Sequence, residues 1–316
     1  MTKPKRVAVA SRSFSRHPVL RAELLAFCPD VTFNDAGVSL SGAALAEFLK
    51  GHDGVITALE TVDEALLAQL PDLKVLSKYG VGFDMVDLEV LKRRGIRFGW
   101  TGGVNKRSVS ELVISAAIAL LRHVPRGYRE VLDGGWKQIQ GRQLTGRTVG
   151  IVGCGHVGKD LALLLKAFDC RLLAYDILDF ADFYAEHGIE AVGLDELLSR
   201  AGIVTLHLPM DASTANILSA EKLAQMRSDA ILINAARGGL VDEAALRTML
   251  ETNKLAGAAL DVLAVEPPTD RALLSLPNVL VTPHIGGSSE EAVLAMGRAA
   301  IEGLASARLP DDGWPG

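Results

Sequence analysis

The sequence is poor in cysteine and in aromatic residues. It contains three cysteines among 316 residues, and aromatic residues make up 5% of the chain. Cys28, Cys154 and Cys170 are an odd number at spacings that fit neither a zinc site nor a disulfide framework. We therefore expect three reduced thiols, which is typical of a reducing compartment and predicts a cytoplasmic protein.

Long apolar runs and an excess of basic charge are also absent. No run approaches the roughly 20 apolar residues of a membrane span. The apolar stretch near the start, residues 7–10, is shorter than the core of a signal peptide. Because 33 Lys and Arg residues stand against 38 Asp and Glu residues, giving a net charge of −5, neither nucleic acid nor a membrane is an expected partner.

Short apolar runs alternate with amphipathic segments of helical length, and 49% of the residues are hydrophobic. This pattern is typical of parallel α/β proteins, and the length predicts two domains. A largely apolar helix is expected at 104–121, and a last helix at 288–305 can return to the first domain. Trp136, in the irregular segment 134–147, is expected to be a packing anchor. Strands are expected at residues 6–10, 54–57, 74–77, 96–98, 148–152, 171–175, 203–206, 230–234, 257–260 and 279–281.

A glycine-rich turn follows the expected strand 148–152 and precedes an expected helix at 161–168. In a dinucleotide-binding unit the first glycine permits a tight turn and the second lets the backbone approach the pyrophosphate. The third allows close packing of helix and strand. Gly153, Gly155 and Gly158 have this spacing. Because free N–H groups and the helix dipole favour anions at a helix N-terminus, the turn predicts a site for dinucleotide phosphates.

An acidic residue at the end of the next expected strand bears on the choice of dinucleotide. Asp176 lies 18 positions after Gly158, close to the roughly 20-residue offset of the acid that binds the ribose hydroxyls. A structural aspartate at a strand end is the alternative. A carboxylate here repels a 2′-phosphate, and residues 177–179 include no arginine to bind one. The sequence therefore predicts NAD rather than NADP.

Five further segments complete a family pattern. Residues 233–243, 259–267 and 281–287 contain the motifs Asn-Ala-Ala-Arg-Gly-Gly, Ala-Leu-Asp-Val and Thr-Pro-His-Ile-Gly-Gly. Together with the glycine turn, and with residues 78–84 and 105–111, they resemble the D-isomer-specific 2-hydroxyacid dehydrogenase family over nearly the whole chain. The resemblance is to its phosphoglycerate dehydrogenase-like members, without the C-terminal regulatory domain that some of them carry.

The resemblance implies an α/β fold of two doubly wound parallel-sheet domains. A flavodoxin-like substrate domain is expected from residues 1–100 with 287–316, and a Rossmann NAD domain from residues 101–286. The chain then crosses twice between the domains, so ligands are expected in a cleft that closes by hinge motion. The helix at 104–121 is expected to pack in a homodimer.

Three residues at the ends of expected strands match the catalytic arginine, glutamate and histidine of the family. The planar fork of Arg237 can grip a carboxylate or polarise a carbonyl. His284 is the expected general acid and base, since histidine exchanges protons near neutral pH. Glu266 can bind the other imidazole nitrogen, fixing the tautomer and favouring the imidazolium. Each residue alone has a structural alternative, but ligands of open α/β sheets bind at such strand ends.

The family pattern also implies contacts to substrate and cofactor. Backbone N–H groups of Val81 and Gly82 are expected to hold the substrate carboxylate, which Arg237 also grips. Lys78 can add charge there or be a solvated lysine, and Asn105 can face the substrate or cap a helix. No metal site is predicted. The expected cofactor contacts beyond the glycines and Asp176 are His156, Val157, His207, Pro209, Thr214, Ala235, Arg237, His284, Gly287 and Asp261, the last near the nicotinamide amide.

Alternatives stay open for the substrate and for the class of function. Met85, Trp100 and Ser110 differ from residues common in the family, which leaves the acid and the physiological direction undetermined. Formate enzymes of the family carry glutamine in place of Glu266, which disfavours formate, whereas phosphite oxidation stays open. A NAD-sensing corepressor-like binding protein would carry a tryptophan just after the histidine, where this chain has Ile285. A metabolic enzyme is therefore preferred.

Overall fold

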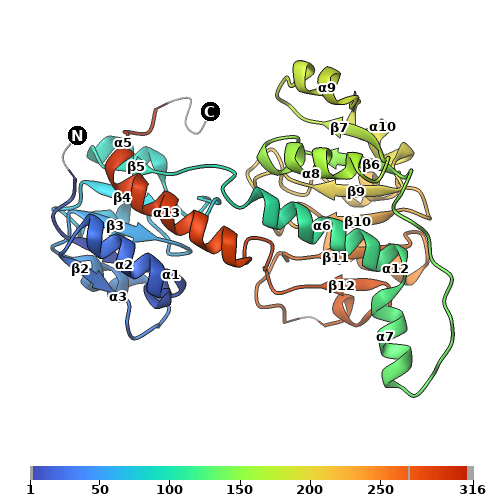
Figure 1. Cartoon of the computed structure of the whole chain (residues 1–316), viewed down its shortest axis with the longest axis horizontal. Coiled ribbons are helices and arrows are strands. Elements are labelled where there is room, and N and C mark those ends of the chain that lie inside the picture. The colour runs from blue at the N-terminus through green and yellow to red at the C-terminus, as the bar shows by residue number, and fades with distance from the viewer. Residues whose placement is uncertain (1–2, 270, 312–316) are drawn as a thin grey trace. The chain divides into compact units, whose positions relative to one another are not determined.

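The computed structural model describes residues 3–269 and 271–311 (Figure 1). The chain divides into two compact units. Unit 1 comprises the described residues of Met1–Asn105 and Glu290–Gly316, and unit 2 comprises Lys106–Ser289. Unit 2 therefore begins at residue 106 and ends at residue 289, whereas the NAD domain was expected at residues 101–286.

Unit 1 is built on a five-stranded sheet in which every neighbouring pair is parallel. The order β2-β1-β3-β4-β5 is that of flavodoxin-like folds. Apolar residues fill the strands, as expected for a sheet covered on both faces. The strands are β1 (Val7–Val9), β2 (Val31–Phe33), β3 (Gly54–Thr57), β4 (Val75–Lys78) and β5 (Arg97–Gly99).

Helices cover both faces of this sheet. One core cluster joins the sheet to α3, α4 and α5, and the other joins it to α1, α2 and α13. The last helix returns to unit 1, as predicted: the Ser77 hydroxyl donates to the carbonyl of Ala300 at 2.7 Å, and Phe98 pairs with Arg308. The helices are α1 (Arg12–Arg16), α2 (Pro18–Phe27), α3 (Gly42–Leu49), α4 (Glu64–Leu67), α5 (Leu88–Arg94) and α13 (Glu290–Ser306).

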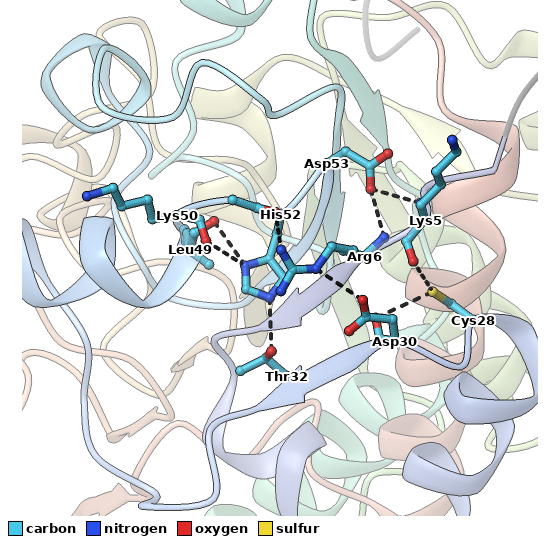
Figure 2. A network of polar contacts seen from close by, with 10 residues as sticks. Lys5, Arg6, Cys28, Asp30, Thr32, Leu49, Lys50, His52 and Asp53 are labelled. Carbon is cyan, nitrogen blue, oxygen red and sulfur yellow. Dashed lines mark hydrogen bonds and ion pairs between the residues drawn. The ribbon is translucent and has the colours of Figure 1, made fainter.

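A polar network closes the amino-terminal edge of the unit 1 sheet (Figure 2). The His52 ring lies 2.9 Å from the Thr32 hydroxyl through Nε2 and contacts two backbone carbonyls through Nδ1. Asp53 accepts the N–H groups of Lys5 and Arg6 at 2.8 and 2.9 Å. These side chains satisfy backbone and neighbouring groups, so the network is structural. The opposite, carboxyl edge is where an open α/β sheet binds ligands.

Unit 2 is built on a seven-stranded parallel sheet in the order β12-β11-β10-β9-β6-β7-β8. The chain reverses direction across the sheet between β6 and β9, which is the switch point of a Rossmann fold. The prediction of two doubly wound parallel sheets is confirmed. The strands are β6 (Thr148–Val152), β7 (Arg171–Tyr175), β8 (Glu190–Ala191), β9 (Ile203–Leu206), β10 (Ile231–Asn234), β11 (Gly257–Leu260) and β12 (Val279–Val281).

Helices again cover both faces. One core cluster contains α6 and α8, and the other contains α10, α11 and α12. The apolar side chains of α6 thus pack largely within its own unit, although Ile118 remains 37% exposed. The elements are α6 (Lys106–Leu121), α7 (Val124–Leu132), α8 (His156–Lys166), α9 (Ala181–His187), α10 (Leu194–Arg200), α11 (Ala220–Leu223), α12 (Glu243–Glu251) and the 3-10 helix η1 (Leu273–Ser275).

Helix α7 projects from the body of unit 2 (Figure 1) and buries none of its residues. Pro125 stands in its first turn, where a proline is tolerated, so the proline after α6 begins a second helix. Trp136 is 86% exposed, and the expectation that it is a packing anchor is wrong. Within the described residues no single helix is long and apolar enough to span a membrane, and α6 and α7 meet that test only as a pair bent by 60°.

Candidate active site

The glycine turn between β6 and α8 has the geometry of a phosphate-binding loop. Gly153 has a φ of +93°, which favours glycine, and a Cβ there would lie 2.7 Å from the His207 carbonyl oxygen. A Cβ at Gly158 would collide with the carbonyl of Gly153. Gly155 faces open space, which leaves room for a ligand against the backbone. Helix α8 begins at His156, five residues before its predicted start at 161. The third glycine, Gly158, therefore lies in the first turn of the helix.

Asp176 follows β7 and is tied to the same loop. One carboxylate oxygen accepts the N–H of Cys154 at 2.6 Å, and the other accepts the N–H of Leu178 at 2.9 Å. The acid is therefore held beside the glycine turn, where a bound dinucleotide would place its adenosine ribose. Asp176 can hold the loop and still bind a ribose, because a carboxylate has further lone pairs that can accept ribose hydroxyl groups.

The loop after β9 contains three expected cofactor contacts. Nε2 of His207 lies 2.9 Å from the Thr205 hydroxyl, and burial lowers the pKa of His207 to about 3, so the ring is neutral at physiological pH. The Thr214 hydroxyl donates to the Pro209 carbonyl at 2.8 Å and accepts the N–H of Asp211 at 2.9 Å. Thr214 thus shapes this loop, and Pro209 is exposed on it.

Arg237 lies in a turn after β10 that is organised by a residue absent from the sequence prediction. Asn234 is 2% exposed, and its side-chain amide donates to the Arg237 carbonyl at 2.8 Å. Its Oδ1 accepts the N–H of Ala236 at 3.1 Å. A Cβ at Gly238 would collide with the Leu263 carbonyl, so the turn packs closely on the chain that leads to Glu266. An asparagine ending a buried strand was the available signal, because it must find backbone partners.

His284 and Glu266 form a direct pair. Nδ1 of His284 lies 2.8 Å from one oxygen of Glu266, and the other oxygen accepts the N–H of Leu263 at 3.0 Å. The carboxylate therefore fixes the ring and directs Nε2 away as the atom that can exchange a proton. His284 has a φ of +54°, an uncommon conformation for a residue with a side chain, which is often seen at functional sites.

Asp261 holds the loop that carries His284. Its carboxylate accepts the Thr282 hydroxyl at 2.6 Å and the N–H groups of Ile285 and Gly286 at 2.8 and 2.7 Å. The residue is 5% exposed. The contact of Asp261 with the nicotinamide amide stays a prediction, and its role as the anchor of the 282–286 loop was not predicted.

In unit 1, the loop after β4 carries the residues expected at the substrate carboxylate. The Val81 and Gly82 N–H groups donate no hydrogen bond to another described residue. Lys78 is 4% exposed and its ammonium donates to the Tyr79 carbonyl at 3.0 Å, so the alternative of a solvated lysine is wrong. The Trp100 indole N–H donates to the Val81 carbonyl at 2.7 Å. Trp100, which departs from the family pattern, thus supports this loop.

The structure groups the expected residues by unit. Those of unit 2 lie in the loops that follow the strands of one parallel sheet or, for residues 156–158, in the first turn of α8. Lys78, Val81, Gly82 and Asn105 belong to unit 1, with Asn105 just before α6. Within the described residues, no group of three or more His, Cys, Asp or Glu side chains could hold a metal ion. The unit 2 residues are Gly153, Gly155, His156, Val157, Gly158, Asp176, His207, Pro209, Thr214, Ala235, Arg237, Asp261, Glu266, His284 and Gly287.

Comparison with known proteins decides the family. Residues 114–286 match the model of the D-isomer specific 2-hydroxyacid dehydrogenase, NAD binding domain. The chain belongs to this family. Hydroxypyruvate reductase of Thermotoga maritima is 36% identical over 78% of this chain and 82% of its own length. The crystal structure of a dehydrogenase assigned to the family, from Polaromonas, superposes with a TM-score of 0.87 at 27% identity, covering 95% of both chains.

As a member of the D-isomer specific 2-hydroxyacid dehydrogenase family, the protein is an oxidoreductase that acts on CH–OH groups with a nicotinamide dinucleotide. The chain spans about half the length of the curated phosphoglycerate dehydrogenases that it matches. That of Synechocystis is 37% identical over 82% of this chain and 47% of its own length. The open face at Gly155 and the acid at Asp176 fit a dinucleotide in this dehydrogenase.

Proposed function

We propose that the protein is an NAD-dependent dehydrogenase that interconverts a D-2-hydroxy acid and a 2-oxo acid. The observation that carries this proposal is the 2.8 Å pair of His284 and Glu266 in the unit that also holds the glycine turn. Glutamate rather than glutamine at position 266 supports a reaction that moves a proton, as 2-oxo acid reduction requires.

Each residue has a defined task in the reductive direction. The nicotinamide, when bound, supplies the hydride that the carbonyl carbon gains. Nε2 of His284 donates the proton that the carbonyl oxygen gains, so the C=O group becomes CH–OH. The guanidinium of Arg237 binds the carboxylate and the carbonyl oxygen. In the oxidative direction His284 accepts the hydroxyl proton.

A screen of NADH oxidation tests the function. The substrates are pyruvate, glyoxylate, hydroxypyruvate, phenylpyruvate and 2-oxoglutarate, with 3-phosphoglycerate and phosphite added in the NAD-reducing direction. Turnover of at least one 2-oxo acid is the expected result. Turnover of phosphite alone would replace the proposed substrate class. No turnover, together with capture of a protein partner only in the presence of NADH, would favour a NAD-sensing binding protein.

We propose NAD as the physiological cofactor because Asp176 stands where NADP would carry its 2′-phosphate. The double variant Asp176→Ser/Ile177→Arg removes the repelling charge and adds a phosphate partner. We expect the ratio of kcat/KM for NADH to that for NADPH to fall by about 100-fold or more. Asp179→Ser is the matched control, since it removes a neighbouring carboxylate and should leave the ratio nearly unchanged. A wild-type enzyme that prefers NADPH would contradict the assignment.

We propose a homodimer in which α7 meets a second copy of the chain. Val124, Tyr128, Val131 and Leu132 of this helix are 50–66% exposed, and Trp136, four residues beyond it, is 86% exposed. The four residues of α7 recur at i, i+4, i+7 and i+8 and therefore share one face of the helix, and an exposed apolar face is typical of an interface. Val131→Glu/Leu132→Glu is expected to convert a particle of twice the 33.6 kDa chain mass into a monomer in light scattering. Leu163→Glu, an exposed leucine of α8, is the control, and a monomeric wild type would exclude the dimer.

We propose the cytoplasm as the compartment. The three cysteines are free, and burial raises the pKa of Cys154 to about 11, so its thiol stays protonated at neutral pH. Cell fractionation tests this assignment.

A further inference from the structure

Helix α6 of unit 2 bonds the loop that carries His284, and none of the proposed catalytic and binding steps uses this contact. The hydroxyl of Ser108, in the first turn of α6, donates to the carbonyl of Gly286 at 2.6 Å across 178 positions of sequence. The same oxygen accepts the N–H of Ser289 at 3.4 Å. A serine hydroxyl in a helix usually points to solvent or bonds a carbonyl of its own helix. Ser108 instead joins two segments that are far apart in the sequence.

Gly286 is held at both of its backbone polar groups. Its N–H donates to Asp261 at 2.7 Å, and its carbonyl accepts the Ser108 hydroxyl. The residue is buried, and a Cβ there would lie 2.9 Å from the Asp261 carboxylate and 3.6 Å from Val109 of α6. The loop therefore packs directly on the helix. Because His284 lies two residues earlier, any shift of Gly286 would also move the backbone that carries the imidazole.

The first turn of α6 is bound in turn to α8, the helix that begins in the glycine turn. Arg107 donates to both carboxylate oxygens of Asp160 at 2.9 and 3.0 Å, and Asp160 is 7% exposed. Two parallel bonds between a guanidinium and a carboxylate fix the orientation of both groups. Ser108 is the next residue, so its hydroxyl belongs to a turn that α8 holds in place. One helical turn thus connects the loop of His284 to the expected phosphate site.

We propose that Ser108 is a positioning residue for the general acid and base. Its bond to Gly286 holds the 282–286 loop against α6, and the pair of Arg107 and Asp160 holds α6 against α8. His284 then keeps a fixed place relative to a dinucleotide bound at the glycine turn. This precision matters because a misplacement of about 1 Å can lower a rate by about 100-fold. The inference rests on the proposed dehydrogenase function, since it concerns the proton donor of that reaction.

Removal of the Ser108 hydroxyl tests the inference. Ser108→Ala is expected to lower kcat for 2-oxo acid reduction by about 10-fold, while KM for the oxo acid and the dissociation constant for NADH stay within about 2-fold of wild type. Ser108→Thr keeps a hydroxyl and should restore most of the lost rate. Ser110→Ala is the matched control, because it removes a hydroxyl of the same helix that lies 3.5 Å from the Val157 carbonyl of α8. Its kcat should stay within about 2-fold of wild type.

A double variant shows whether Ser108 acts through His284. In the His284→Asn background, Ser108→Ala should lower kcat by less than about 2-fold, because the group that Ser108 positions is already absent. An equal loss in both backgrounds would mean that Ser108 supports the fold in general, and it would overturn the inference. A wild-type kcat in Ser108→Ala, together with a slow His284→Asn, would overturn it as well.

Hydrogen exchange of backbone amides tests the contact without any substrate. The N–H groups of Ile285 and Gly286 should exchange about 5-fold faster in Ser108→Ala than in wild type, the range for loss of one hydrogen bond. In Ser110→Ala the two rates should equal those of wild type. Unchanged exchange in Ser108→Ala would overturn the inference. Failure of the proposed function is distinct, since the wild type would then reduce no 2-oxo acid.

Discussion

Replacing His284 with asparagine is expected to lower kcat for 2-oxo acid reduction by about 10²- to 10⁴-fold, the usual contribution of a general acid and base. An amide cannot donate the proton that Nε2 supplies. Asparagine is preferred to alanine because position 284 has a φ of +54°, which asparagine tolerates best among residues with a side chain. Single-turnover kinetics with excess NADH measures the effect.

NADH binding by the same variant separates chemistry from folding. The glycine turn and Asp176 follow β6 and β7, so the dissociation constant from NADH fluorescence should stay within about 2-fold of wild type, since none of these groups is altered. His187→Gln, which removes a histidine of α9 in the same unit, is the control and should keep full activity. A rate near that of wild type in His284→Asn would show that another group supplies the proton.

Replacing Arg237 is expected to give the second large effect. Arg237→Ala should lower kcat/KM by about 10³- to 10⁴-fold, because two charge-assisted hydrogen bonds to the substrate are lost. Arg237→Lys keeps the charge but loses the planar fork, and a loss of about 100-fold is expected. Steady-state kinetics with a saturating concentration of NADH measures both variants.

Chemical rescue makes the test of Arg237 specific. Added guanidinium should restore part of the activity of Arg237→Ala, and it should leave His284→Asn unchanged. Arg247 of α12 pairs with Glu251. Arg247→Lys is the control, because it replaces a guanidinium with an ammonium group elsewhere in unit 2. If Arg237→Lys retained wild-type kcat/KM, the proposal that Arg237 binds the substrate through two hydrogen bonds would be wrong.

The architecture and the residues with chemical side chains were predictable from the sequence. Strand positions followed from short apolar runs, and the glycine spacing located the turn before α8. Strands β2 and β8 were missed, because β2 has only one fully buried residue, Phe33, and the two residues of β8 are exposed, so neither forms an apolar run. The exposure of Trp136 also escaped prediction, since a tryptophan in a glycine-rich segment suggests a buried anchor.

The supporting contacts of the site were not predictable. Asn234 and Trp100 act by bonding backbone carbonyls, and Asp261 holds a loop through two backbone N–H groups and one hydroxyl. These contacts depend on which loops lie side by side in the folded chain. The loops come from strands that are far apart in the sequence, so the sequence alone does not show which of them are neighbours.

The return of α13 to unit 1 has a consequence for synthesis on the ribosome. Unit 2 is continuous in sequence and can fold as soon as residue 289 has emerged. Unit 1 begins first, yet one face of its sheet is covered only by α1 and α2 until Met296, Ala300 and Leu304 of α13 join its core. The bond between Ser77 and Ala300 spans 223 positions. Unit 1, which begins at the N-terminus, is therefore the last unit to be completed. Its apolar core is the part of the chain that chaperones would have to shield for longest during synthesis.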